Sequence, residues 1–249
     1  AAVMEAYPVR GRWASLPWAA TVGYAENSVG IRINEGIWQG VTAVDRNPLV
    51  VADAQTGKGV WIGRIEEHGQ PAWAAMTVAS AGRRIAGIDA LIRRKEYGAP
   101  WAEPMRAPEY PELPAARRTG RAAMAASAAA FHAAMDQGTA APAGIADNCR
   151  WFVNGQDVGG CAAQFGGPGL AGIGGVRDRT LLAVDEARGL AIYRMFEDRP
   201  ATAGSGYPLT YQVVELFRFD QGRIAEVQAF TAELPYGMAP HGAPGRSSR

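Results

Sequence analysis

The chain has 249 residues, with 25 Lys and Arg against 24 Asp and Glu, and 48% of its residues are hydrophobic. This composition is ordinary for a globular protein, and the net charge of +1 gives no reason to expect a nucleic-acid partner. No run of about 18 apolar residues occurs, so no membrane-spanning helix is predicted. No signal peptide is evident after Ala1, so we expect a cytoplasmic protein, with a removed leader left open.

The first half of the chain predicts a short helix followed by strands. Residues Ala1 to Tyr7 are interpreted as the tail of a truncated helix. Alternating apolar residues and flanking turn residues predict strands over residues 21–27, 49–52, 60–66 and 72–79. Gly82-Arg-Arg is the hairpin turn into a last strand. The prolines that follow predict an extended linker, because proline fixes φ and removes a hydrogen-bond donor.

The second half predicts a longer helix and then a second set of strands. The Ala-rich stretch from Pro114 to Gln137 favours a helix that ends at Gly138. Its apolar residues recur every three or four positions, so we expect one buried face formed by Met124, Ala128, Phe131 and Met135. Strands are predicted over residues 149–154, 181–184, 190–197 and 209–219. Asp220-Gln-Gly-Arg is the second hairpin turn.

The two halves carry the same motifs in the same order. Asp53-Ala-Gln-Thr-Gly57 corresponds to Asp185-Glu-Ala-Arg-Gly189, and Glu96-Tyr-Gly98 corresponds to Pro235-Tyr-Gly237. A repeat of such long period indicates two copies of one α+β unit. We predict a first unit over residues 1–99, a linker over 100–113, a second unit over 114–240 and a tail over 241–249.

The last predicted strand pair carries a family resemblance. Glu215-Leu-Phe-Arg-Phe-Asp-Gln-Gly-Arg-Ile-Ala-Glu-Val-Gln-Ala-Phe230 resembles the final two strands of nuclear-transport-factor-2-like (NTF2-like, SnoaL-like) domains. The ending Leu234-Pro-Tyr-Gly-Met238 resembles that of an uncharacterised subgroup. The resemblance implies two tandem NTF2-like cones, in each of which helices pack on a strongly curved antiparallel sheet. Single cones of this superfamily dimerise through their sheets, so two fused copies would pair internally, and a further homo-oligomer is left open.

The resemblance also implies a class of function. Pocket enzymes of the superfamily work mostly without cofactors, and some bacterial members remove formaldehyde from lignin-derived diarylpropane diols to give a stilbene. We therefore expect a cofactor-independent lyase whose partner is a small hydrophobic aromatic molecule. The alternatives are a dehydratase or isomerase for another aromatic or polycyclic compound, or a non-catalytic module for ligand binding or assembly. With three histidines and no Cys-x-x-Cys, no metal site is expected.

Strand alternation identifies the first candidate catalytic residues. Tyr211 and Glu215 share a mostly apolar face, where burial would raise the pKa of the carboxyl towards the range used in acid–base catalysis. Tyr193 lies on a similar face of the preceding strand. We expect Glu215 to act as base and Tyr211 or Tyr193 as acid. The alternatives are that the tyrosines are core aromatics and that Glu215 is a surface or paired carboxylate.

Other candidates lie elsewhere in the sequence. His132 adjoins the buried helix stripe and has the intrinsic pKa of a neutral-pH base, although a core histidine is the alternative. Arg64 is expected to stabilise a phenolate or oxyanion, or else to form a surface pair with Glu66. Tyr24 ends a strand near the expected mouth of the first cone. Asn27 and Asn154 occupy equivalent positions, which indicates a shared turn or backbone cap.

The sequence further suggests residues that would bind substrate. Large aromatic side chains form rigid apolar walls with polar tips, which suits an aromatic ligand. The expected substrate-binding residues are Trp38, Trp61, Trp151, Phe196 and Arg179. The Gly-rich stretch over residues 166–175 is interpreted as a mobile loop and a candidate lid. Met76 stands where the second unit has Glu215, so we expect the second unit to be the active one.

Two cysteines lie close together in the second unit. Cys149 and Cys161 flank a short stretch of chain, and a disulfide there would favour an oxidising compartment. Of the two alternatives, we favour a pair of free thiols.

Overall fold

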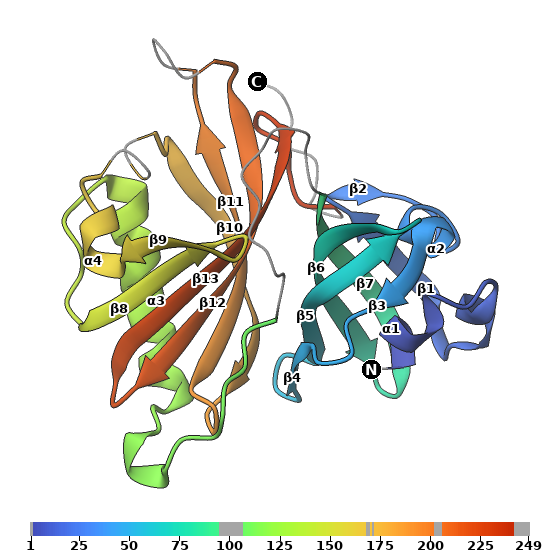
Figure 1. Cartoon of the computed structure of the whole chain (residues 1–249), viewed down its shortest axis with the longest axis horizontal. Coiled ribbons are helices and arrows are strands. Elements are labelled where there is room, and N and C mark those ends of the chain that lie inside the picture. The colour runs from blue at the N-terminus through green and yellow to red at the C-terminus, as the bar shows by residue number, and fades with distance from the viewer. Residues whose placement is uncertain (1, 95–106, 168–169, 171, 202–205, 242–249) are drawn as a thin grey trace.

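The structure is a computed structural model that describes residues 2–94, 107–167, 170, 172–201 and 206–241. Several predicted features lie outside these residues: the motif Glu96-Tyr-Gly98, the first half of the linker, part of the Gly-rich loop and nearly all of the tail. The described chain is mixed α+β, with most of its regular structure in two sheets (Figure 1). Among these residues no helix is both long and apolar enough to cross a membrane.

The first unit is built around one sheet. Its elements in chain order are α1 (Ala2–Ala6), a 3-10 helix (Arg12–Ser15), β1 (Trp18–Glu26), β2 (Val29–Gly30), α2 (Ile37–Gly40), β3 (Val41–Val44), β4 (Leu49–Asp53), β5 (Lys58–Glu67), β6 (Gln70–Ala81) and β7 (Arg84–Arg94). The strand order is β2-β1-β7-β6-β5-β3, and β4 also pairs with β5. Each predicted strand is present, and most extend a few residues beyond the predicted bounds.

The second unit repeats this plan with a longer helix. Its elements are a 3-10 helix (Ala115–Arg117), α3 (Arg121–Gln137), β8 (Ile145–Val153), β9 (Gln156–Gly160), α4 (Cys161–Gln164), β10 (Gly175–Asp185), β11 (Leu190–Arg199), β12 (Leu209–Asp220) and β13 (Arg223–Pro235). The strand order is β10-β11-β12-β13-β8-β9. The helix was predicted from Pro114 but begins at Arg121, because the backbone at Arg118 and Gly120 is extended. It ends at Gly138 in the left-handed conformation, as predicted.

The two sheets share one topology, which fits a tandem duplication. In each unit the first long strand runs parallel to the last one, β1 beside β7 and β8 beside β13, while the other pairings are antiparallel. Asn27 and Asn154 follow these first strands with φ of 45° and 49°. The Asn27 side chain accepts a hydrogen bond from the amide of Ile92, and Asn154 accepts one from the amide of Thr231. The prediction of a shared backbone cap is therefore confirmed.

Each sheet has an inner face and an outer face. On the inner face of the second sheet lie the buried α3 residues Met124, Ala128, Phe131 and Met135, as the helix periodicity predicted. The two sheets lie with their outer faces towards each other (Figure 1). Side chains of both faces form one apolar cluster, in which Trp73 of β6 contacts Phe230 of β13 at a ring-centroid distance of 5.5 Å. Tyr110 of the linker packs on the same cluster. The two units therefore pair through their outer sheet faces.

The cysteines form a disulfide between Cys149 of β8 and Cys161 of α4, so the favoured expectation of two free thiols is wrong. Both residues are buried, and the pairing ties the short helix α4 to the sheet. Pairing follows from the β8–β9 hairpin, which brings Gly160 opposite Arg150. Structural disulfides are typical of oxidising compartments, which weighs against the expected cytoplasmic location.

Candidate functional site

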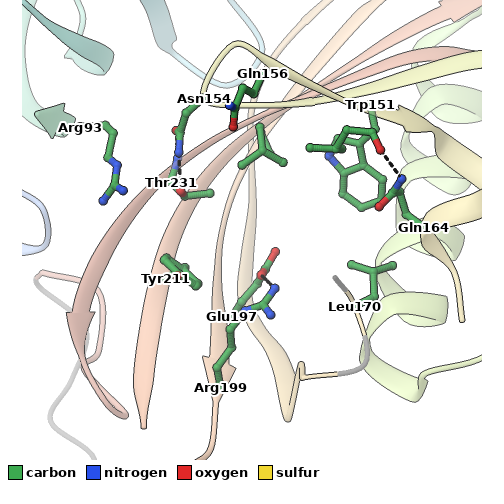
Figure 2. A pocket seen from close by; sticks show the side chains of 13 residues that line it. Arg93, Trp151, Asn154, Gln156, Gln164, Leu170, Glu197, Arg199, Tyr211 and Thr231 are labelled. Carbon is green, nitrogen blue, oxygen red and sulfur yellow. Dashed lines mark hydrogen bonds and ion pairs between the residues drawn. The ribbon is translucent and has the colours of Figure 1, made fainter. Parts of the chain in front are cut away.

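A cavity of about 380 Å³ opens on the inner face of the second sheet. Its walls come from β8, β9, α4 and strands β11 to β13 (Figure 2). Its polar lining side chains include Glu197, Arg199, Tyr211 and Gln164, and its apolar ones include Trp151 and Leu170. Cavities of this size with mainly apolar walls and a few polar groups are typical of small-molecule sites.

Glu197 is the buried carboxyl of this cavity. It belongs to β11 and is only 7% exposed, and its inward direction follows from alternation with Tyr193 and Met195 on the same strand. Burial raises the pKa of Glu197 from 4.5 to about 7, because the charged form loses its hydration. Arg199 lowers the pKa against this trend, and the negative charge of Glu215 raises it further. Glu197 therefore exchanges a proton near neutral pH.

Arg199 and Tyr211 complete the polar group around Glu197 (Figure 2). The Arg199 Nη2 atom donates a hydrogen bond to Glu197 Oε2 at 3.4 Å, and its guanidinium lies 5.4 Å from the centre of the Tyr211 ring. Tyr211 pairs with Glu197 across β11 and β12, and its hydroxyl donates to Glu233 at 3.3 Å. Burial, followed by the charge of Glu233, raises the pKa of Tyr211. The phenol is therefore protonated at neutral pH and serves as a hydrogen-bond donor.

A second polar pair lies deeper on the same face. His132 of α3 and Glu215 of β12 are 1% and 0% exposed, and His132 Nε2 lies 2.7 Å from Glu215 Oε2. The other oxygen of Glu215, Oε1, has no hydrogen-bond partner in the described part of the chain. The His132 ring lies edge-on to Tyr193, with 5.3 Å between ring centres. His132, Glu215 and Tyr193 do not line the cavity. Glu215 affects it through its negative charge, which raises the pKa of Glu197.

The rim of the cavity draws on other segments. Gln164 of α4 donates to the carbonyl of Val158 at 2.7 Å, which fixes the helix against β9. Leu170 belongs to the Gly-rich stretch that was predicted to be a mobile loop and a lid. Part of that stretch lies outside the described residues. Arg93 reaches the rim from β7 of the first unit, and its positive charge lowers the pKa of Tyr211. The first unit thus contributes a cation to a cavity in the second.

The structure brings some of the predicted site residues together. Tyr211 and Trp151 line the cavity, while Glu215, Tyr193 and His132 form the buried group behind it. Tyr211 and Glu215 do share one face, as alternation predicted. Glu215 is a paired carboxylate, which was the alternative interpretation.

Other predicted residues lie outside the cavity. Arg64 is on the first unit in an exposed ion pair with Glu66, with 3.1 Å between Nη2 and Oε1. Phe196 is fully buried on the opposite face of β11, where the guanidinium of Arg177 lies 5.3 Å from its ring centre. Arg179 is exposed within β10, at an irregularity in the pairing with β11, and does not precede that strand as predicted.

The remaining predicted residues fill the inside of the first unit. Tyr24, Trp38 and Trp61 are 3%, 7% and 4% exposed and belong to its apolar cluster. Trp38 stacks on Tyr7 with 3.6 Å between ring centres, and the Tyr24 hydroxyl donates to Glu26. Burial raises the pKa of Glu26. These side chains form a packed interior that shares no residue with the cavity of the second unit.

The sequence reasoning missed Glu197 and Arg199. Both continue the alternation that placed Tyr193 and Met195 on one face, so extending that pattern by two and four residues would have found them. Within the described ranges, no group of three or more His, Cys, Asp or Glu residues is placed to hold a metal ion.

Comparison with known proteins bears on the second unit. A family model described as "Domain of unknown function (DUF8021)" matches residues 117–231. The match runs from the turn before α3 into β13 and includes every residue that lines the cavity except Arg93. No curated protein and no solved structure matches the chain.

Proposed function

We propose that the second unit is a cofactor-independent lyase built on an NTF2-like cone and acting on a small aromatic molecule. The observation that carries the proposal is Glu197, a carboxyl with a pKa of about 7 in a partly apolar cavity, beside a cation and a phenol. A group with a pKa near the working pH is the most effective general base, since it is both present as base and able to accept a proton.

Each neighbouring group has a chemical role in this proposal. Glu197 takes a proton from the substrate. Tyr211, kept protonated by its raised pKa, turns its hydroxyl from Glu233 to the substrate and donates its one hydrogen bond to a departing hydroxyl or a developing oxyanion. Arg199 stabilises the negative charge that forms. Trp151 and Leu170 supply apolar walls for an aromatic ring.

Deformylation of a diarylpropane diol would use all three polar groups, Glu197, Tyr211 and Arg199. The benzylic hydroxyl takes the proton of the Tyr211 hydroxyl and leaves as water. The substrate phenol gives up its own proton, which returns to Tyr211 through solvent, and the substrate becomes a quinone methide. Glu197 then removes the proton of the primary alcohol. The carbon–carbon bond breaks as the alkoxide oxygen forms the carbonyl of formaldehyde. The electron pair of the broken bond forms the stilbene double bond, and the quinone methide returns to an aromatic phenolate. The phenolate, stabilised by Arg199, receives the proton held by Glu197 through solvent, which gives the hydroxystilbene and restores the base.

The test is incubation of the purified protein, without added cofactor or metal, with a panel of phenolic aromatic diols. Formaldehyde release and near-ultraviolet stilbene absorbance are followed together. We expect both products with the wild type and a rate loss of about 100-fold or more in Glu197→Gln, because general base catalysis contributes roughly 10²–10⁴-fold. Glu109→Gln is the matched control, since Glu109 is exposed and lies outside the cavity.

Two outcomes would refute parts of the proposal. If no diol is converted but an aromatic compound raises the melting temperature of the wild type, the cavity binds ligand without this chemistry. If the diols are converted equally fast by Glu197→Gln, the reaction does not use the carboxyl on which the proposal rests.

A further inference from the structure

A second cavity, of about 250 Å³, lies at the edge of the contact between the two units. It shares no lining residue with the site around Glu197. The first unit contributes Lys58 and Thr77, and the second contributes Arg194 and Thr180. Neither unit alone would form it, because its walls come from both sheets.

The cavity has an excess of positive charge. Arg194 is paired with Asp89, with 2.5 Å between Nη1 and Oδ2, and Asp89 also accepts a hydrogen bond from Gln212. Lys58 forms no ion pair with any residue that the structure describes. One carboxylate therefore faces two cations, which leaves a net charge of +1 on this trio. Partial burial and the nearby charge of Arg194 lower the pKa of Lys58, as expected for an ammonium that lacks a counterion.

The remaining lining favours a small organic molecule over a bare ion. Thr77 is only 8% exposed, and its hydroxyl makes no hydrogen bond to another described residue. The apolar lining residues include Ala25, Ile88 and Leu182. At Gly23 an added Cβ would meet no atom within 4 Å, so this part of the floor is open.

We propose that this cavity is a binding site for a small monocarboxylate with an apolar body. The carboxylate accepts hydrogen bonds from the Lys58 ammonium and the Thr77 hydroxyl. Arg194, held in place by Asp89, adds its positive charge. The apolar side chains contact the carbon skeleton. A monoanion matches the net charge of the trio formed by Lys58, Arg194 and Asp89, so its binding leaves no excess charge on these three groups.

The chain has so few lysines that Lys58 can be followed individually by NMR. Lys58 and Lys95 are the only lysines in the chain. Reductive ¹³C-methylation of the whole protein keeps their positive charge and gives one dimethylamine resonance for each, besides that of the amino terminus. The Lys58 resonance is assigned by its loss in Lys58→Arg. Benzoate is the probe, with the neutral benzyl alcohol and inorganic phosphate as comparisons.

We expect benzoate to shift the Lys58 resonance saturably and to leave that of Lys95 unchanged. Benzyl alcohol should cause no comparable shift. Phosphate should bind more weakly, because the net charge of +1 on the trio does not balance a second negative charge. By calorimetry, Lys58→Gln should bind benzoate about tenfold more weakly or worse, whereas Lys58→Arg should retain binding.

Three results would overturn the proposal. The first is a Lys58 resonance that does not respond to benzoate. The second is benzyl alcohol or phosphate shifting it as strongly as benzoate does. The third is a folded Lys58→Gln variant that binds benzoate with wild-type affinity. None of these results depends on catalysis by the other cavity, because the resonance reports only on the surroundings of Lys58.

Discussion

The raised pKa of Glu197 has a consequence for stability that needs no substrate. Its pKa is about 7 in the folded chain against an ordinary value of 4.5. Well below pH 4.5 the carboxyl is protonated in both states. As the pH rises from 4.5 to 7, the unfolded chain releases its proton first, so the free energy of unfolding falls. One pKa unit corresponds to about 1.4 kcal/mol, so Glu197 lowers stability by about 3 kcal/mol between pH 4 and pH 8.

Substitution by glutamine removes this contribution while it keeps the size of the side chain. We expect the unfolding free energy of Glu197→Gln, relative to the wild type, to rise by about 3 kcal/mol from pH 4 to pH 8. Urea denaturation of both proteins at several pH values measures this difference directly, and comparison with the wild type cancels the titration of groups that do not interact with Glu197. Glu109→Gln, which changes an exposed carboxyl, should show no such rise.

The reasoning fails if the stability difference between Glu197→Gln and the wild type is independent of pH. A carboxyl-carbon NMR titration provides a second check on the same protein. A Glu197 resonance with its midpoint near pH 4.5 would mean that Arg199 and solvent compensate for burial. The carboxyl would then be a poor general base, and the proposed function would lose its main support.

Three further predictions concern the surroundings of this site. Replacing Cys149 and Cys161 with alanine should lower the unfolding free energy by about 3 kcal/mol, because the disulfide closes a short loop; equal denaturation midpoints for both proteins, or two free thiols by mass spectrometry, would contradict this. His132→Leu should cost about 3–5 kcal/mol by leaving the buried Glu215 unpaired, and the double variant with Glu215→Leu should recover most of it in urea denaturation. Glu215→Gln should lower the pKa of Glu197 in an NMR titration, since the charge of Glu215 contributes to raising it; an unchanged midpoint would show that the two carboxyls are not coupled.

Features that depend on local patterns could be predicted from the sequence. Alternation along residues 209–219 correctly placed Tyr211 and Glu215 on one buried face, since neighbouring side chains on a strand point to opposite sides. The helix stripe around Phe131 followed from the 3.6-residue period. The repeat identified Asn27 and Asn154 as equivalent caps, because a turn that recurs in two copies serves the fold they share.

Features that depend on contacts between distant segments could not be predicted. Arg64 has the right chemistry for an oxyanion partner, but it lies on the first unit beside Glu66, and Arg199 occupies the cavity. Nothing in the local pattern distinguishes these two arginines. His132 and Glu215 were both identified, yet their pairing arises only because α3 crosses the inner face of β12. Phe196 looked suitable as an aromatic wall, but alternation with Glu197 sends it to the outer face.

The two units differ at the positions of the Tyr193–Glu215 pair. Tyr193 pairs with Glu215 across β11 and β12, and the equivalent pair across β5 and β6 is Trp61 with Met76. The first unit thus has apolar side chains where the second has a phenol and a carboxylate, and they pack without the cost of burying a charge.

The first unit supports the second in two ways. Its outer face covers Ile192 and Phe230, which would otherwise expose apolar surface to water. It also places Arg93 at the rim of the cavity, where its charge reaches Tyr211. A single unit that paired with an identical copy could not combine a filled interior with an open one. Duplication within one chain allows this asymmetry, because each copy can change its inner face while both keep the outer faces that join them.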